Sequence, residues 1–241
     1  MEERENSSFM ELIICSMLQV SREEEYLFMG KRRRLVEQLK EKGIADQKVL
    51  NAIEKIPRHL FFDDSTARPA LLDHAYSDKA LPIGAGQTIS HPYTVAYQSE
   101  LLAVTAGEKV LEIGTGCGYQ TAVLCELGAK VFSIERQRSL YEKTKHFLPM
   151  IGYRSPKLMF GDGYKGWPLY APFDKIIVTA AAPYLPEDLL RQLKVGGIMV
   201  IPIGEGETQQ MTWLKRTGDT AFDRKVLGGF KFVPMLQDKQ H

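Results

Sequence analysis

Between residues 109 and 203, short apolar segments typical of strands alternate with longer segments that have the period of helices. The expected strands are 109–113, 130–135, 156–160, 173–178 and 198–203, and the expected helices are 121–127, 139–151 and 186–193. Strands separated by helices pair in parallel through right-handed crossovers, which place helices on both faces of the sheet. The pattern therefore predicts an α/β fold with a Rossmann-like, doubly wound, mostly parallel sheet.

Two more strand-like segments, 211–215 and 225–233, follow one another without a helix between them. Strands joined directly pair in antiparallel fashion, because a parallel pair needs a longer crossover. We therefore expect one antiparallel pair at the edge of the sheet.

The chain before residue 107 is less regular. A helical period begins near Lys31 and ends at Gly43, and a second helix is expected between its N-cap Asp46 and Pro57. Residues 63–86 contain scattered Pro, Asp and Gly, which predict irregular connections. A third helix is expected to begin between residues 90 and 92.

The composition is that of an ordinary globular protein. Apolar residues make up 44% and charged residues 25% of the 241 residues, and the net charge is +1. A charge this small gives no general attraction to nucleic acid or to anionic lipid. The apolar stretch 12–20 is too short to span a bilayer and lacks a basic flank, so it predicts neither an anchor nor a signal peptide. Three cysteines form no disulfide framework, and we expect a cytoplasmic protein.

A glycine-rich turn follows the expected strand 109–113. Its glycines are Gly114, Gly116 and Gly118, a spacing that differs from the G-x-G-x-x-G pattern of dinucleotide sites. Glu112, beside this turn, would repel a pyrophosphate. S-adenosylmethionine has no phosphate, and its ammonium suits the carboxylate of Glu112, directly or through water. Glycines also let the backbone approach a ligand closely.

Two further carboxylates follow the next two strands. Glu135 ends the strand 130–135, where it can accept both ribose hydroxyls of a nucleoside. Asp162, followed by Gly163, comes after the third strand, where it can accept a hydrogen bond from the adenine amine. The carboxyl ends of parallel strands form the edge at which open α/β sheets bind ligands. The sequence thus predicts S-adenosylmethionine as the cofactor, S-adenosylhomocysteine as its product, and no metal ion.

Upstream, residues 84–96 read Gly-Ala-Gly-Gln-Thr-Ile-Ser-His-Pro-Tyr-Thr-Val-Ala. This segment resembles the signature of protein-L-isoaspartate O-methyltransferases. The resemblance continues through 110–120, 161–168, 171–174, 181–183, 195–197 and 201–204, and it covers roughly residues 33 to 234. It implies a class I S-adenosylmethionine-dependent methyltransferase that methylates L-isoaspartyl carboxylates in damaged proteins and so starts their repair through a succinimide.

The resemblance also implies roles for single residues. It makes Ser90 the catalytic residue, and it places next to the cofactor Gln87, Thr88, Ile89, Ser90, Glu112, Glu135, Asp162 and Gly163. One departure lies near the C-terminus. Leu236 stands where some relatives have a threonine, so a polar contact from that position is not expected.

The chemistry of the acceptor agrees with such a role for Ser90. An isoaspartyl α-carboxylate, with a pKa of about 3.5, is ionised at neutral pH and needs no general base. Methyl transfer then requires alignment in a dry site. The hydroxyl of Ser90 can donate to one carboxylate oxygen and leave the other to attack. The alternative is that Ser90 only caps the helix that follows.

Two other functions remain as alternatives. A nucleic-acid methyltransferase would use the basic run 31–34, although the small net charge and the alanines at 181 and 182 disfavour it. A non-catalytic S-adenosylmethionine-binding module would not need the segment 87–90. We expect residues 1–30 to form a loosely attached extension and residues 31–241 a single methyltransferase domain. Within that domain, residues 31–106 are the helical part with the acceptor segment and residues 107–241 the cofactor-binding sheet. A monomer is expected, with isoaspartyl proteins and peptides as its partners.

Overall fold

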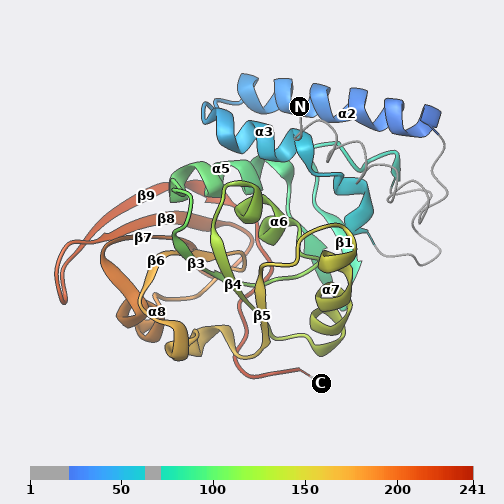
Figure 1. The fold of residues 1–241 in the computed structure, drawn as a ribbon. Helices are drawn as coiled ribbons and strands as arrows, with labels where there is room; N and C mark the ends of the chain where they lie inside the picture. Colours follow the sequence, from blue (N-terminus) through green and yellow to red (C-terminus); the bar gives the residue numbers. More distant parts are fainter. Residues whose placement is uncertain (1–21, 63–71, 241) are drawn as a thin grey trace.

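The computed structural model describes residues 22–62 and 72–240. Their central element is a seven-stranded sheet (Figure 1). The sheet has the order β5-β4-β3-β6-β7-β8-β9. Its strands are β3 (Lys109–Ile113), β4 (Lys130–Glu135), β5 (Lys157–Phe160), β6 (Phe173–Val178), β7 (Leu193–Ile203), β8 (Gln209–Arg216) and β9 (Phe222–Phe230). The five strands from β5 to β7 are parallel, which confirms the predicted doubly wound sheet.

The antiparallel region is larger than predicted. Strand β8 pairs antiparallel with β7 as well as with β9, so there are two antiparallel pairs rather than one. The reason is that the short turn at 204–208 joins β7 directly to β8. In addition, β7 begins at Leu193, five residues before the expected strand 198–203, and runs through the glycines at 196 and 197.

Helices cover both faces of the sheet (Figure 1). Helices α5 (Pro92–Leu102) and α6 (Tyr119–Glu126) pack on the face that carries Val110, and α8 (Glu187–Gln192) packs on the face that carries Leu111. Helix α7 (Arg138–Met150) lies against β4 and β5. Successive residues of β3 therefore enter different cores, as the alternation of a strand requires.

Two N-terminal helices form a further layer over α5 and α6 (Figure 1). Helix α3 (Gln47–Lys55) begins as predicted, because the carboxylate of Asp46 accepts hydrogen bonds from the backbone N–H groups of residues 48 and 49. Helix α2 (Arg22–Glu41) begins nine residues before Lys31, where the helical period starts in the sequence. Residues 26–30 bury only Phe28, so this part of the helix has no apolar stripe to reveal it. Most of the predicted N-terminal extension, residues 1–21, lies outside the described residues.

A β-hairpin begins within residues 63–86, the segment that was predicted to be irregular, and ends just after it. Strands β1 (Leu81–Gly84) and β2 (Gln87–Ile89) pair antiparallel around a turn in which Ala85 and Gly86 have φ values of 49° and 67°. Positive φ at both positions is the geometry of a tight hairpin turn. Strands of three and four residues are too short to show an alternating pattern, which is why the prediction was wrong here. Three short 3-10 helices complete the described elements: η1 (Arg58–Phe61), η2 (Gly163–Lys165) and η3 (Pro168–Tyr170).

Candidate active site

A pocket lies at the carboxyl ends of β3, β4 and β6. It encloses about 850 Å³ of empty space, counting the open solvent at its mouth. The lining comes from the β1–β2 hairpin, α5 and the connection between them (Ile83, Gln87, Thr88, Ile89, Ser90, Val95), from β3, its turn and α6 (Ile113, Gly114, Thr115, Gly116, Cys117, Tyr119, Gln120), and from the end of β4 and the residues after it (Ile134, Glu135, Arg136, Gln137). The remaining lining residues are Gly163, Thr179, Ala180 and the C-terminal Val233, Pro234, Met235 and Leu236. The predicted acceptor segment and the predicted cofactor turn therefore meet in one cavity.

The glycine turn after β3 depends on backbone conformations that other residues rarely adopt. Gly114, Gly116 and Gly118 all have positive φ, at 97°, 54° and 88°. A Cβ on Gly114 would meet the hydroxyl oxygen of Thr179 at 2.5 Å, and that hydroxyl is within hydrogen-bonding distance of the carbonyls of Ile113 and Gly114. Gly114 and Gly116 line the pocket. Gly118 does not, and a Cβ there would clash with side chains of α7 instead.

Glu135 joins the end of β4 to the glycine turn. One carboxylate oxygen accepts the backbone N–H of Gly116 at 2.8 Å, and the other accepts that of Gln137 at 2.8 Å. Burial raises the pKa of Glu135, although these N–H groups act in the opposite direction. The carboxylate is thus oriented at the pocket wall, where its remaining lone pairs can receive hydroxyl groups.

The other two predicted carboxylates do not line the pocket. Glu112 is 0% exposed and lies under α6, where the hydroxyl of Thr121 donates to it. It is the second-last residue of β3, so its side chain lies over the face of the sheet and not beyond its edge. Asp162 accepts the backbone N–H of Tyr164 at 2.9 Å, while its neighbour Gly163 lines the pocket. Contacts of Glu112 and Asp162 with a cofactor remain predictions.

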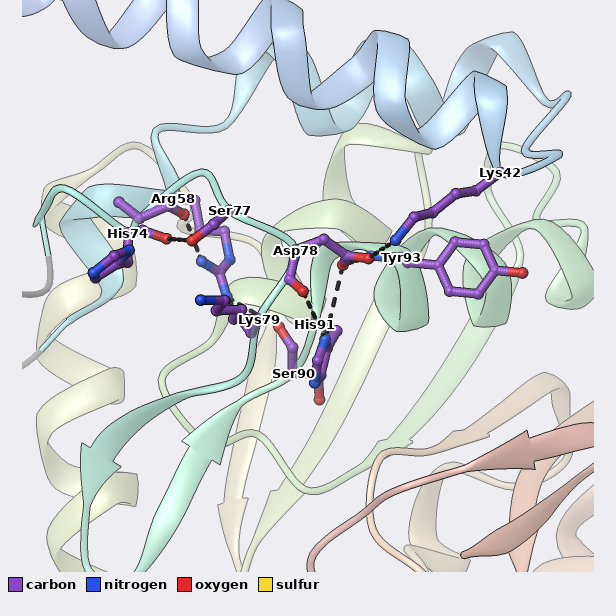
Figure 2. A network of polar contacts seen from close by, with 10 residues as sticks. Lys42, Arg58, His74, Ser77, Asp78, Lys79, Ser90, His91 and Tyr93 are labelled. Carbon is purple, nitrogen blue, oxygen red and sulfur yellow. Dashed lines mark hydrogen bonds and ion pairs between the residues drawn. The ribbon is translucent and has the colours of Figure 1, made fainter.

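Ser90 connects β2 to α5, and it lines the pocket. The N-cap of α5 is His91, and no side chain of the cap residue bonds to the first turn. Instead, the carboxylate of Asp78 accepts the N–H of Tyr93 at 2.8 Å (Figure 2). The alternative in which Ser90 caps the helix is therefore wrong, and its hydroxyl is not engaged by the first turn of α5.

Periodicity and local motifs missed the part of the wall that the C-terminus supplies, and only the family resemblance pointed to it, at position 236. The guanidinium of Arg136 donates to the carbonyl of Asp238 at 3.1 Å and to the side chain of Gln240 at 3.0 Å. The backbone N–H of Met235 donates to the carbonyl of Ala181 at 2.7 Å. These bonds hold residues 233–236 at the pocket, where Leu236 is 47% exposed. The segment has no period or motif that could have placed it there.

The basic run 31–34 makes contacts within the protein. Lys31 pairs with Asp73 at 3.5 Å, Arg33 pairs with Glu54 at 3.6 Å, and Arg32 donates to a backbone carbonyl of α3. Across residues 22–62 and 72–240, there is no cluster of potential metal ligands. No helix in those ranges combines the length and the apolar character needed to cross a membrane.

Residues 30–240 match the model of the family described as protein-L-isoaspartate(D-aspartate) O-methyltransferase. The chain is similar to the protein-L-isoaspartate O-methyltransferase of Christiangramia forsetii, with 63% identity over 214 residues that cover 89% of this chain and 98% of the relative. The corresponding protein of Flavobacterium psychrophilum is 58% identical over 210 residues, which cover 87% of this chain and 96% of the relative.

Two solved structures have the same fold. One, a protein-L-isoaspartate O-methyltransferase, is 30% identical, with a TM-score of 0.76 over 84% of this chain and 65% of that chain. The chain therefore spans about two thirds of that structure's length. The other, a putative enzyme of this kind from Plasmodium falciparum in complex with S-adenosyl-L-homocysteine, is 24% identical. Its TM-score is 0.72, over 86% of this chain and 99% of that chain.

Proposed function

Because the chain belongs to the protein-L-isoaspartate O-methyltransferase family, we propose that its pocket holds S-adenosylmethionine against the glycine turn, with Ser90 facing the carboxylate to be methylated. The reaction is methylation of L-isoaspartyl residues in proteins, which starts their repair. The observation that supports this arrangement is that Ser90, Gly114 and Glu135 line one pocket, although 24 and 45 residues (114 − 90 and 135 − 90) separate Ser90 from the other two.

S-adenosylmethionine supplies an electrophilic methyl group on its sulfonium. One oxygen of the isoaspartyl carboxylate forms the new bond to this carbon as the sulfur–carbon bond breaks, and sulfur retains the electron pair. The products are a methyl ester and S-adenosylhomocysteine, and no proton moves in this step. Afterwards, the neighbouring backbone nitrogen of the substrate displaces methanol and forms a succinimide, which water opens to aspartyl or isoaspartyl.

The task of the protein in this reaction is orientation. Ser90 donates its hydroxyl to the second carboxylate oxygen, which fixes the attacking oxygen in line with the methyl group. We assign the ribose hydroxyls to Glu135 and the close backbone contacts to Gly114 and Gly116, with Gly118 shaping the same turn. The hairpin borders the cofactor with Gln87, Thr88 and Ile89. Gly163, which follows β5, borders it as well. Neither Glu112 nor Asp162 lines the pocket, so a contact of Glu112 with the ammonium through water and one of Asp162 with the adenine amine stay predictions.

The function is tested with three matched peptides that contain isoaspartate, aspartate or neither, each incubated with methyl-labelled S-adenosylmethionine. We expect label only on the isoaspartyl peptide, as a base-labile ester. Label on the aspartyl peptide at an equal rate, or on RNA, would contradict the proposal.

Replacement of Glu135 by glutamine is expected to weaken S-adenosylhomocysteine binding by about tenfold or more, the loss of roughly 1.5–3 kcal/mol for a hydrogen bond to a charged group. A glutamine amide cannot accept with both ends, so it also loses one of the two backbone N–H bonds that orient the side chain. Calorimetric titration measures the change. Glu142→Gln on α7, which does not line the pocket, is the control. Equal affinities of the two variants would place the ribose elsewhere.

The cytoplasmic location and the monomeric state stay predictions. So does the division into an extension of residues 1–30 and a single domain of residues 31–241. Sedimentation equilibrium of the purified protein tests the oligomeric state.

A further inference from the structure

The side chain of Arg58 is buried in the N-terminal half of the protein. It is 0% exposed, and its guanidinium donates to three backbone carbonyls, those of Ala75, Lys79 and Ser90, the last two at 3.1 Å (Figure 2). The guanidinium also lies 5.7 Å from the centre of the Tyr119 ring. Within residues 22–62 and 72–240, no carboxylate is in salt-bridge distance of Arg58. The guanidinium therefore holds the backbone of the loop 75–79 and of Ser90 in place.

The residues after Ser90 are attached to the same loop. The Nδ1 of His91 donates to the carbonyl of Asp78 at 3.0 Å, and the carboxylate of Asp78 accepts the N–H of Tyr93. That carboxylate also pairs with Lys42, beyond the end of α2 (Figure 2). Residues 90–93 thus rest on residues 75–79, and Arg58 is the group that ties the two segments together at Ser90.

We propose that Arg58 is a positioning residue for methyl transfer, which sets the place of the Ser90 hydroxyl in the pocket by holding the carbonyl of the same residue. The inference rests on the proposed role of Ser90. A backbone held at its carbonyl cannot slide along the pocket wall, so the hydroxyl keeps one distance to the acceptor carboxylate. A displacement of about 1 Å in such a group can cost about 100-fold in rate.

A purely structural role is the competing explanation for this buried arginine. Removal of the guanidinium leaves the carbonyls of Ala75, Lys79 and Ser90 without their donor, so a loss of stability is expected in either case. Stability therefore does not separate the two explanations. A purely structural role predicts the same rate loss whether or not residue 90 carries a hydroxyl. A positioning role predicts a rate loss only when the hydroxyl of Ser90 is present.

The test is a double-mutant cycle between Arg58→Met and Ser90→Ala, with single-turnover methylation of an isoaspartyl peptide at saturating S-adenosylmethionine as the readout. We expect Arg58→Met to lower the rate about 10- to 100-fold when Ser90 is present and less than about threefold when Ser90 is alanine. Affinity for S-adenosylhomocysteine, measured on each variant, verifies the folded pocket. Arg32→Met, which removes a partly exposed arginine that also donates to a carbonyl, is the matched control.

The outcomes separate the two proposals. Equal effects of Arg58→Met in both backgrounds, with a rate loss for Ser90→Ala alone, would overturn the positioning role and leave Ser90 in place. No rate loss for Ser90→Ala would instead overturn the proposed role of Ser90. If Arg58→Met does not fold, the same cycle with Arg58→Lys decides. A lysine keeps the charge but cannot present a planar fork to three carbonyls, so the same coupling with Ser90 is expected.

Discussion

Alanine at position 90 is expected to lower kcat by about 100-fold while leaving affinity for S-adenosylhomocysteine within about threefold, in line with the loss of one oriented donor from an active site. Ser90 lines the pocket and its side chain does not cap α5, so removal of the hydroxyl leaves the helix start unchanged. The acceptor carboxylate would then rotate freely, and fewer encounters would place an oxygen in line with the methyl group. Steady-state methylation of an isoaspartyl peptide gives kcat.

Ser77→Ala is the matched control for this variant. Ser77 belongs to the loop that supports residue 90, and its hydroxyl donates to the carbonyl of His74 away from the pocket (Figure 2). We expect its kcat to stay within about twofold of the unmodified protein, as for surface substitutions generally. If Ser90→Ala is as active as this control, Ser90 does not touch the acceptor.

The stability of the protein is expected to fall with rising pH because of Glu112. Burial raises the pKa of this carboxyl from 4.5 to about 7, against the hydrogen bond from Thr121 that favours the charged form. The folded protein therefore holds a proton on Glu112 at pH values where the unfolded chain has released it. The stabilisation that this proton brings is complete below pH 4.5 and is lost as the pH rises through 7.

Glu112→Gln isolates this effect. Glutamine keeps the shape of the protonated acid and an acceptor for Thr121, but it does not titrate. The free energy of unfolding of the unmodified protein should fall by about 3 kcal/mol relative to Glu112→Gln between pH 4.5 and pH 8, from 2.5 pKa units. Urea unfolding at the two pH values measures it. Parallel pH profiles would mean that Glu112 is charged in the folded protein.

Periodicity predicted the sheet because each parallel strand lies between two layers of helices. Ile176, Ile177 and Val178 form an unbroken apolar run and are all fully buried. Between residues 109 and 192, the strands and α-helices begin and end within two residues of their predicted limits. The N-cap at Asp46 could also be predicted, because the two N–H groups that its carboxylate accepts belong to residues 48 and 49, close to it in the chain. The family resemblance located the hairpin segment as part of the site, although not its strands.

The sequence alone thus determined the doubly wound architecture and the glycine turn. Through the family resemblance, it also assigned residues 87–90 and that turn to the same active site. Only the tertiary structure decided which side chains face the pocket. Glu112 lies under α6, and the C-terminal residues 233–236 form part of the pocket wall. Asp78, and not Ser90, accepts the N–H of the first turn of α5. Each of these depends on contacts between residues more than eight positions apart along the chain. Local propensity cannot encode such contacts, because they form only when the packed layers bring distant segments together.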